Sequence, residues 1–99
     1  MQSHYTEHFE RDMATTDAEW LLRLPLAIGD APWQQDGARA QVRLGEGRLT
    51  IAWHPLPVRQ IALLRMARLG VRFDFEGVDA AERLRFMQRF DLTMQRGGG

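Results

Sequence analysis

The first candidate for chemistry is a group of two histidines and one glutamate near the start of the chain. His4, Glu7 and His8 match the H-x-x-E-H pattern of inverted zinc proteases, in which two histidines share a metal ion and the glutamate acts as the base. Glu76 or Glu82 would have to supply a third ligand. A pattern with so few required positions matches often by chance, and 99 residues leave little scaffold for a protease cleft. We therefore predict no metal site, and only His4 and His8 stand as candidate ligands.

Nucleophile–base pairs are scarce in this chain. There is no cysteine, and the one serine is Ser3 at the N-terminus. His54 follows Trp53 at the end of a predicted strand and has no nucleophile to activate. Asp74 and Glu76 share one face of a strand and are of the type that forms paired carboxylate sites, but such residues more often face arginines across a sheet. The sequence therefore predicts that the protein is not an enzyme.

Arginine is the most promising binding residue. All thirteen basic residues are arginine, a usage that a GC-rich bacterial genome explains. Arginine also binds carboxylate and phosphate groups bidentately. Arg59, Arg65 and Arg72 lie in the most apolar part of the chain, and with Trp53 as a shield they would line an anion or small-molecule pocket between sheet and helix. The alternative for Arg65 is that its side chain extends past the sheet edge into solvent.

A second set of arginines follows a helical repeat near the C-terminus. Arg85, Arg89 and Arg96 fall on one outward stripe of a predicted helix. A nucleic-acid site would need such a stripe together with exposed aromatic side chains and a basic domain. The net charge is zero, the pI is about 6.8 and the aromatic residues are predicted to point inward, which disfavours nucleic acid. The stripe remains an alternative of lower rank.

Length and composition are typical of a globular protein. The 99 residues are expected to form one domain, 1–99, and the 44% of hydrophobic residues suffices for a single core. The start of the chain lacks a basic and apolar leader, and no run reaches the roughly 18 apolar residues that span a bilayer. We expect a cytoplasmic protein with no membrane contact and no cofactor. Residues 1–36 carry a net charge of −5 and residues 37–99 one of +5, so the N-terminal part is expected to pack near the basic body.

Two helical segments are predicted to position the N-terminal residues. Residues 3–14 would form a short, loosely attached helix that begins at Ser3 and places one aromatic or methionine side chain every fourth residue on the same face. A second helix starts at Thr16, where Thr-x-x-Glu matches a capping box, and ends at Leu24 because Pro25 follows. Residues 25–38 are predicted to form a loop.

Residues 38–54 are predicted to form a β-hairpin because apolar and polar residues alternate on both sides of a glycine-rich turn. A two-residue turn at Glu46-Gly47 pairs Gly45 with Arg48 and brings Leu44 opposite Leu49. With this turn, or with another loop of even length, all apolar residues of the hairpin lie on one face, whereas a shift of one residue would invert one strand.

The stretch Val58–Phe75 is expected to organise the fold, because it is the longest one dominated by apolar residues. After a break at residues 55–57, Val58–Met66 is predicted to be a central strand that is covered on both faces, and a helix is the alternative. Leu69–Glu76 is predicted to be a strand with one apolar face. The apolar side chains that the core is expected to bury are Ile61, Leu63, Leu64, Val71, Phe73 and Phe75.

A C-terminal helix completes the predicted fold. It starts at Asp79 with a capping pattern, runs to about Met94 with one apolar face, and is followed by a flexible tail at residues 95–99. The predicted fold class is α+β, a four-stranded antiparallel meander sheet with an N-terminal helical segment and the C-terminal helix packed on the sheet.

A non-catalytic binding or interaction domain, monomeric or homodimeric, agrees best with these features. The expected partner is another protein or a second copy of the chain, because a central strand that is apolar on both faces needs a second cover. Binding of an anionic small molecule through the arginine-lined pocket is the first alternative, and binding of nucleic acid through the helical stripe is the second.

Overall fold

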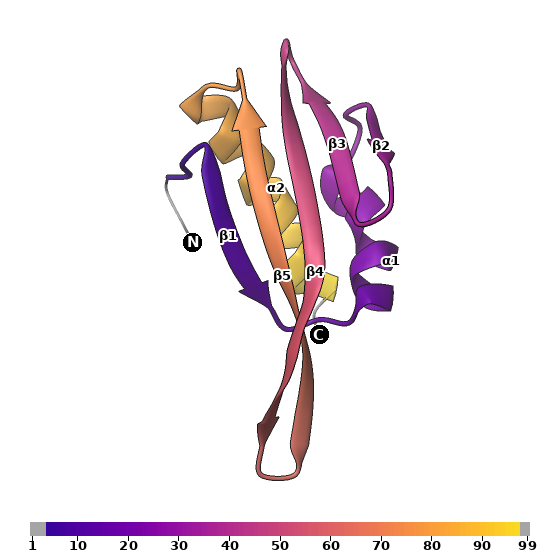
Figure 1. Cartoon of the computed structure of the whole chain (residues 1–99). Helices are drawn as coiled ribbons and strands as arrows, with labels where there is room; N and C mark the ends of the chain where they lie inside the picture. Colours follow the sequence, from indigo (N-terminus) through magenta and orange to yellow (C-terminus); the bar gives the residue numbers. More distant parts are fainter. Residues whose placement is uncertain (1–3, 98–99) are drawn as a thin grey trace.

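Residues 4–97 are described by a computed structural model, in which a five-stranded antiparallel sheet carries two helices on one face (Figure 1). In chain order the elements are β1 (His8–Met13), α1 (Asp17–Ile28), β2 (Trp33–Gln35), β3 (Arg39–Leu44), β4 (Gly47–Ile61), β5 (Leu64–Glu76) and α2 (Ala80–Gly97). The strand order across the sheet is β1-β5-β4-β3-β2. The α+β class is confirmed, whereas the predicted count of four strands is wrong for the part of the chain described.

The additional long strand is β1, which replaces the helix predicted over residues 3–14. β1 pairs antiparallel with β5, and Phe9 lies opposite Phe73 with the ring centroids 4.9 Å apart. Residues four positions apart lie on the same face of a strand as well as on the same face of a helix. The spacing of the apolar side chains in this segment therefore did not distinguish a strand from a helix. The predicted cap Ser3 lies outside the described residues.

The start of α1 agrees with its predicted capping box. The side-chain oxygen of Thr16 accepts a hydrogen bond from the backbone N–H of Glu19 at 3.1 Å. Asp17 and Glu19 place negative charge at the positive end of the helix.

The end of α1 differs from the prediction, because the helix continues through Pro25 to Ile28. Pro25 lacks an N–H, but its carbonyl accepts a hydrogen bond from Gly29 N at 3.1 Å. Leu24 and Ile28 are buried on the same face, and this burial favours the continued helix over the predicted loop at residues 25–38. The remainder of that segment includes the short edge strand β2.

The β3–β4 hairpin confirms a two-residue turn and a single apolar face, but the turn is Gly45-Glu46 and not Glu46-Gly47. Leu44 therefore pairs with Gly47, two positions away from the predicted register. Gly45 has a φ of +59°, a conformation that favours glycine at the turn. Gly47 belongs to the strand, where a Cβ atom would meet the carbonyl oxygen of Gly77 at 2.3 Å.

The largest correction concerns Val58–Met66. The segment is extended, as predicted, but it is not a central strand: it forms parts of β4 and β5 and the turn Ala62-Leu63 between them. The two prolines at 55 and 57 do not end β4, although the pairing with β5 shifts between Leu56 and Arg59. The end of this hairpin projects beyond the rest of the sheet (Figure 1).

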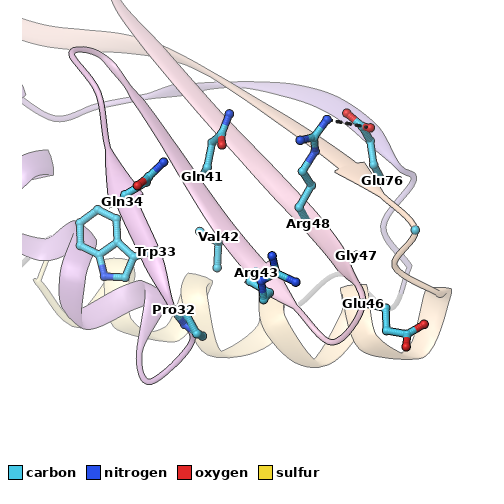
Figure 2. Close-up of a pocket in the computed structure, with 11 residues that line it drawn as sticks. Pro32, Trp33, Gln34, Gln41, Val42, Arg43, Glu46, Gly47, Arg48 and Glu76 are labelled. Atoms are coloured by element: carbon cyan, nitrogen blue, oxygen red, sulfur yellow. Dashed lines mark hydrogen bonds and ion pairs between the residues drawn. The ribbon is translucent and has the colours of Figure 1, made fainter.

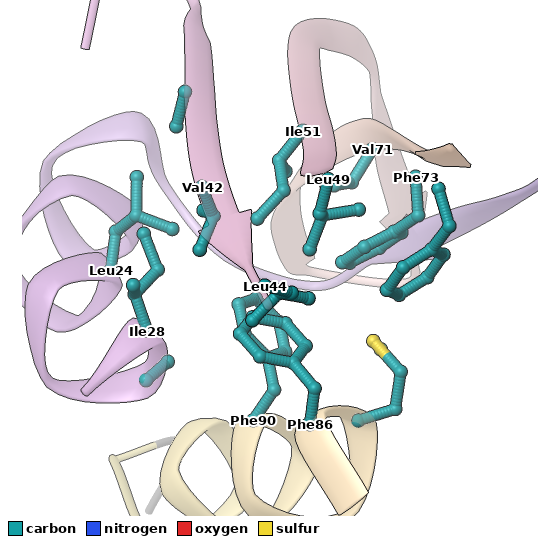
Figure 3. Close-up of a cluster of buried hydrophobic side chains, with 14 of the residues drawn as sticks. Leu24, Ile28, Val42, Leu44, Leu49, Ile51, Val71, Phe73, Phe86 and Phe90 are labelled. Atoms are coloured by element: carbon teal, nitrogen blue, oxygen red, sulfur yellow. The ribbon is translucent and has the colours of Figure 1, made fainter. Parts of the chain in front are cut away.

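The core lies between the sheet and both helices (Figure 3). The inner face of the sheet, defined as the face toward the helices, contributes Val42, Leu49, Ile51, Val71, Phe73 and Phe75, among others. Trp20 and Leu24 of α1 and Phe90 of α2 are fully or almost fully buried against this face. Of the side chains predicted to be in the core, Val71, Phe73 and Phe75 are buried, whereas Ile61, Leu63 and Leu64 are exposed to solvent.

The helix α2 starts as predicted, with the N–H of Glu82 donating to the Asp79 carboxylate at 2.9 Å. It extends to Gly97, beyond the predicted end at Met94. The predicted flexible tail at residues 95–99 is therefore helical up to Gly97, and its last two residues lie outside the described part. None of the described helices combines the length and apolar character needed to cross a membrane.

Candidate functional site

The most prominent surface feature is the projecting end of the β4–β5 hairpin, residues 56–68, which we call the β-arm. It contributes to an elongated molecule with extents of 47 × 29 × 21 Å (Figure 1). Cross-strand pairs Arg59–Met66, Gln60–Arg65 and Ile61–Leu64 hold its two strands together. No third strand of the described chain pairs with it, because β1 reaches only as far as Leu69 along β5.

The β-arm exposes large apolar side chains. The exposed fractions are 49% for Val58, 56% for Ile61, 97% for Leu63, 67% for Leu64 and 39% for Met66. Ile61 and Leu64 lie directly opposite each other, and Met66 follows on the same face of the ribbon. Isolated exposed leucines are normal in proteins, whereas contiguous exposed apolar groups are uncommon on monomeric proteins.

All charged side chains of the β-arm are arginines. At its root, where the arm leaves the sheet, Arg59 and Arg68 pair with a carboxylate of β1. Asp12 at the end of β1 accepts hydrogen bonds from Arg68 Nε at 3.0 and 3.1 Å, and Arg59 lies 3.9 Å from the same carboxylate. Arg68 Nη1 also donates to the carbonyl of Pro57 at 3.1 Å. The hydrogen bonds from Arg68, with the positive charges of Arg68 and Arg59, lower the pKa of Asp12.

The outer face of the sheet, opposite the helices, is polar, and no other element of residues 4–97 covers it. Asp74 lies there on β5, 2.9 Å from both His8 Nδ1 and Arg72 Nε. Arg48 pairs with Glu76 at 3.3 Å. These pairs are exposed and contribute little stability individually.

A hollow of about 780 Å³ opens beside β2, β3 and the start of β4 (Figure 2). Trp33, Gln41 and Arg43 line it together with Arg48, which faces Arg43 directly across the strands. Like charges in this arrangement repel each other. Arg48 has the carboxylate of Glu76 as a partner, whereas Arg43 has no ion-pair partner among the described residues.

The structure does not bring the predicted pocket residues together. Trp53 is 5% exposed and belongs to the core. Arg59 and Arg65 lie on the β-arm, and Arg72 lies on the outer face of the sheet. Arg65 extends into solvent and donates weakly to Gln60 at 3.4 Å, and the space between sheet and helices is filled by the buried apolar cluster.

Arg85 and Arg89 of the predicted arginine stripe on α2 are both exposed, and the Arg89 side chain also reaches α1. The side chain of Arg96 lies outside the described part of the chain. The guanidinium of Arg89 lies against Gly29, where a Cβ atom would meet its Cζ at 2.4 Å. Arg89 therefore brings positive charge to the C-terminal end of α1, whose own last turn has no basic residue.

The histidine pair does not have the geometry that its spacing suggested. His8 begins β1 and pairs with Asp74, whereas His4 precedes the strand, so the two are not successive positions on one helix face. Within residues 4–97, no three His, Cys, Asp or Glu side chains are grouped so that they could hold a metal ion.

One partly buried polar cluster was not predicted from the sequence. Arg11 of β1 donates to Asp91 of α2 at 2.5 and 3.0 Å, and the hydroxyl of Tyr5 donates to the same carboxylate at 2.6 Å. The guanidinium also lies 5.5 Å from the ring centroids of Phe9 and Phe73. The cluster joins β1 to α2 across 80 residues of sequence, and no local pattern indicates it.

The cluster raises the pKa of Tyr5 and of Arg11. Burial and the hydrogen bond to Asp91 raise the pKa of Tyr5. Burial opposes the charge on Arg11, but the hydrogen bonds and charge of Asp91 outweigh it and raise the pKa of Arg11. The hydrogen bonds of the cluster attach β1 and the segment before it to α2.

Comparison with known proteins identifies no relative: no family model, curated protein or solved structure matches the chain.

Proposed function

We propose that the protein is a non-catalytic interaction module that binds a protein partner, either another chain or a second copy of itself, through the β-arm. The observation that supports this most is the exposure of five large apolar side chains on one projecting element: Val58, Ile61, Leu63, Leu64 and Met66.

The cost of this exposure explains why a partner is expected. A two-stranded hairpin without further cover is marginally stable in water. Full burial of a fully exposed apolar side chain supplies roughly 1.5–3 kcal/mol, and each of these side chains forgoes the share that corresponds to its exposed fraction. A bound partner that covers the β-arm recovers this energy.

The test compares the wild type with variants in which one apolar side chain of the β-arm becomes charged. Leu64→Glu is suitable because Leu64 is 67% exposed and the substitution leaves the core intact. Leu92→Glu on α2 is the matched control, since Leu92 is 41% exposed and lies far along the chain from the β-arm. Proteins bound from an extract of the source cells are identified, purified and titrated against each variant by calorimetry.

The proposal predicts that Leu64→Glu weakens the measured association, with a partner protein or with a second copy, by at least about tenfold, or 1.4 kcal/mol. Leu92→Glu should bind like the wild type. Equal affinity of the Leu64→Glu and wild-type proteins in every association would refute the role of the β-arm.

Anion binding is a second candidate, and the hollow beside β2 is the observation that favours it. Arg43 and Arg48 face each other there, and an anion placed between them would relieve their repulsion. Titration with inorganic phosphate should show saturable binding that Arg43→Gln removes. Arg85→Gln, which changes an exposed arginine on α2, should leave it unchanged. Absence of saturable binding to the wild type would eliminate this candidate.

Nucleic-acid binding through α2 ranks below both candidates. Arg89 lies against α1, and the aromatic side chains nearest to it in the sequence, Phe86 and Phe90, are buried. Stacking of bases on these rings would require the core to open.

A further inference from the structure

A second group of exposed apolar side chains lies on α1. Leu22 is 74% exposed and Leu26 68%, and they are four residues apart, so they are neighbours on one face of the helix. The opposite face of α1 holds Trp20 and Leu24 in the core. The outward leucines have no role in that packing, so they form a surface patch, here called the α1 patch.

The α1 patch and the β-arm carry opposite charge. Residues 17–30 contain Asp17, Glu19 and Asp30 but only one basic residue, Arg23, which gives a net charge of −2. Residues 56–68 contain Arg59, Arg65 and Arg68 and no acidic residue, which gives +3, and the carboxylate of Asp12 at the root reduces the local charge to +2. Two apolar groups with complementary charge at their margins are suited to bind each other, because charge complementarity selects the partner and burial supplies the affinity.

The two surfaces also lie near the same end of the molecule. Asp12 contacts Arg68 at the root of the β-arm, and α1 begins only five residues after Asp12 (Figure 1). The β-arm projects away from the body, so within one chain its apolar face and the α1 patch remain apart. In a dimer with two-fold symmetry, a contact between the arm of one copy and the α1 patch of the other occurs twice.

We propose that the partner of the β-arm is a second copy of this chain, and that each arm packs its Ile61–Leu64 face on Leu22 and Leu26 of the other copy. This inference rests on the proposed function, because it names the partner of the same surface. Each dimer then contains two identical arm–helix contacts. Both exposed apolar groups of the chain become buried, and both acquire oppositely charged neighbours.

The experiment measures the sedimentation of the full chain over about 1–500 μM, a range that covers dissociation constants typical of small interfaces. The wild type should show a concentration-dependent monomer–dimer equilibrium. Leu64→Glu on the arm and Leu26→Glu on α1 should each weaken dimerisation at least tenfold, whereas Leu92→Glu should not. The milder variants Leu64→Ser and Leu26→Ser replace the charged ones if unfolding curves show loss of the fold.

Mixing the two variants distinguishes this dimer from other arrangements. In a mixed dimer, the intact arm of the Leu26→Glu chain meets the intact α1 patch of the Leu64→Glu chain, so one complete contact remains. The mixture should therefore dimerise more strongly than either variant alone. Association of arm with arm, or of α1 with α1, offers no such rescue, and its absence would refute the proposal.

The possible failures are separable from those of the proposed function. A wild type that stays monomeric at every concentration overturns the second copy as partner, as does a dimer that Leu26→Glu does not weaken. If Leu64→Glu still abolishes binding of another protein, the interaction function of the β-arm stands without self-association. If Leu64→Glu changes neither dimerisation nor binding of another protein, both proposals are refuted.

Discussion

Arg68 contacts the carboxylate of Asp12 at the point where β1 ends and the β-arm leaves the sheet. Arg68 Nε lies 3.0 and 3.1 Å from the two carboxylate oxygens, and its Nη1 reaches the carbonyl of Pro57 on the adjacent strand. One side chain thus connects β1, β5 and β4 at the root of the arm. The ion pair orients the arm relative to the body, and the proposed dimer requires such an orientation.

Loss of this ion pair should loosen the root of the arm without unfolding the body. Asp12→Asn removes the charge that Arg68 contacts, and amide hydrogen exchange at residues 56–59 and 66–68 should become faster than in the wild type. Arg68 lowers the pKa of Asp12 in the folded protein below its usual value of 3.8. The ion pair therefore stabilises the root of the arm fully above pH 3.8, and this stabilisation is lost as the pH falls through the lowered pKa. The difference between wild type and Asp12→Asn should vanish in that acidic range. A difference that persists there would contradict this interpretation.

Removal of Asp91 should destabilise the whole fold. Asp91→Ala leaves the partly buried guanidinium of Arg11 and the hydroxyl of Tyr5 without their shared acceptor. We expect a loss of about 2 kcal/mol in the free energy of unfolding, measured by urea denaturation. Glu76→Ala serves as the control: it removes an exposed ion pair with Arg48 and should change stability by less than about 0.5 kcal/mol. Equal effects of the two substitutions would argue against a special role for Asp91.

High pH should destabilise the protein through Tyr5. The chain contains one tyrosine, no lysine and no cysteine, so Tyr5 dominates side-chain titration between about pH 9 and 12. Its folded pKa is raised by burial and by the hydrogen bond to Asp91, so the unfolded chain loses this proton first. The protonated Tyr5 therefore contributes fully to the free energy of unfolding below about pH 10, the pKa of tyrosine in an unfolded chain. This contribution is lost as the pH rises through the higher pKa of Tyr5 in the folded protein. The absorbance of tyrosinate should follow the raised pKa, and Tyr5→Phe should remove the decrease in stability. A wild type as stable at the top of this range as at pH 9 would exclude the mechanism.

Two glycines should differ in their tolerance of alanine. A Cβ atom at Gly47 would meet backbone oxygens of Gly77 and Glu76 at 2.3 and 2.5 Å, so the strand and the loop must move apart. We expect Gly47→Ala to cost about 3 kcal/mol in the free energy of unfolding. Gly37 has a φ of +61° and nothing within 4 Å of a Cβ atom, so Gly37→Ala should cost only about 1 kcal/mol from backbone conformation. Chemical denaturation of both variants tests the order, and the opposite order would contradict the close approach at Gly47.

The apolar residues of Val58–Phe75 and its partner strand should fall into two energetic classes. Leu63 is 97% exposed at the tip of the β-arm, so Leu63→Ala should change the stability of the monomer by less than about 0.5 kcal/mol. Ile51 is fully buried between sheet and helices, and Ile51→Ala should cost about 3–4 kcal/mol. Unfolding must be measured at protein concentrations below those at which the chain associates. A large loss from Leu63→Ala under these conditions would indicate that the tip packs within its own chain.

The sequence predicted those features that depend only on residues close together in the chain, namely the helix starts and the alternating strands. Thr16 and Asp79 cap the two helices as expected, because a side-chain oxygen and an N–H three residues later belong to the same helical turn. The alternation in residues 39–54 predicted a hairpin with one buried face, since the side-chain period of a strand is two residues. The exact turn was missed by one residue, because the close contact of Gly47 with Gly77 involves the loop after β5, a distant part of the chain.

The candidate site was not predictable in the same way. Arg59 and Arg65 were predicted to bind a ligand together with Trp53 and Arg72, but the two arginines lie on the β-arm, whereas Trp53 lies in the core and Arg72 on the outer face of the sheet. The apolar side chains of the β-arm were interpreted as core, because hydrophobic residue types indicate a preference for burial but do not state what buries them. No turn residue marks Ala62-Leu63 as the tip of a hairpin.

The sequence by itself therefore determined where the chain is helical at α2 and where it alternates at β3 and β4, because those patterns repeat over neighbouring residues. Only the tertiary structure decided that residues 8–13 form a strand, since Phe9 and Met13 acquire that state by pairing with β5 more than fifty residues away. It also decided that both helices lie on one face and that Ile61 and Leu64 are left in solvent. Burial depends on which distant elements cover a side chain, and that arrangement is a property of the folded chain as a whole.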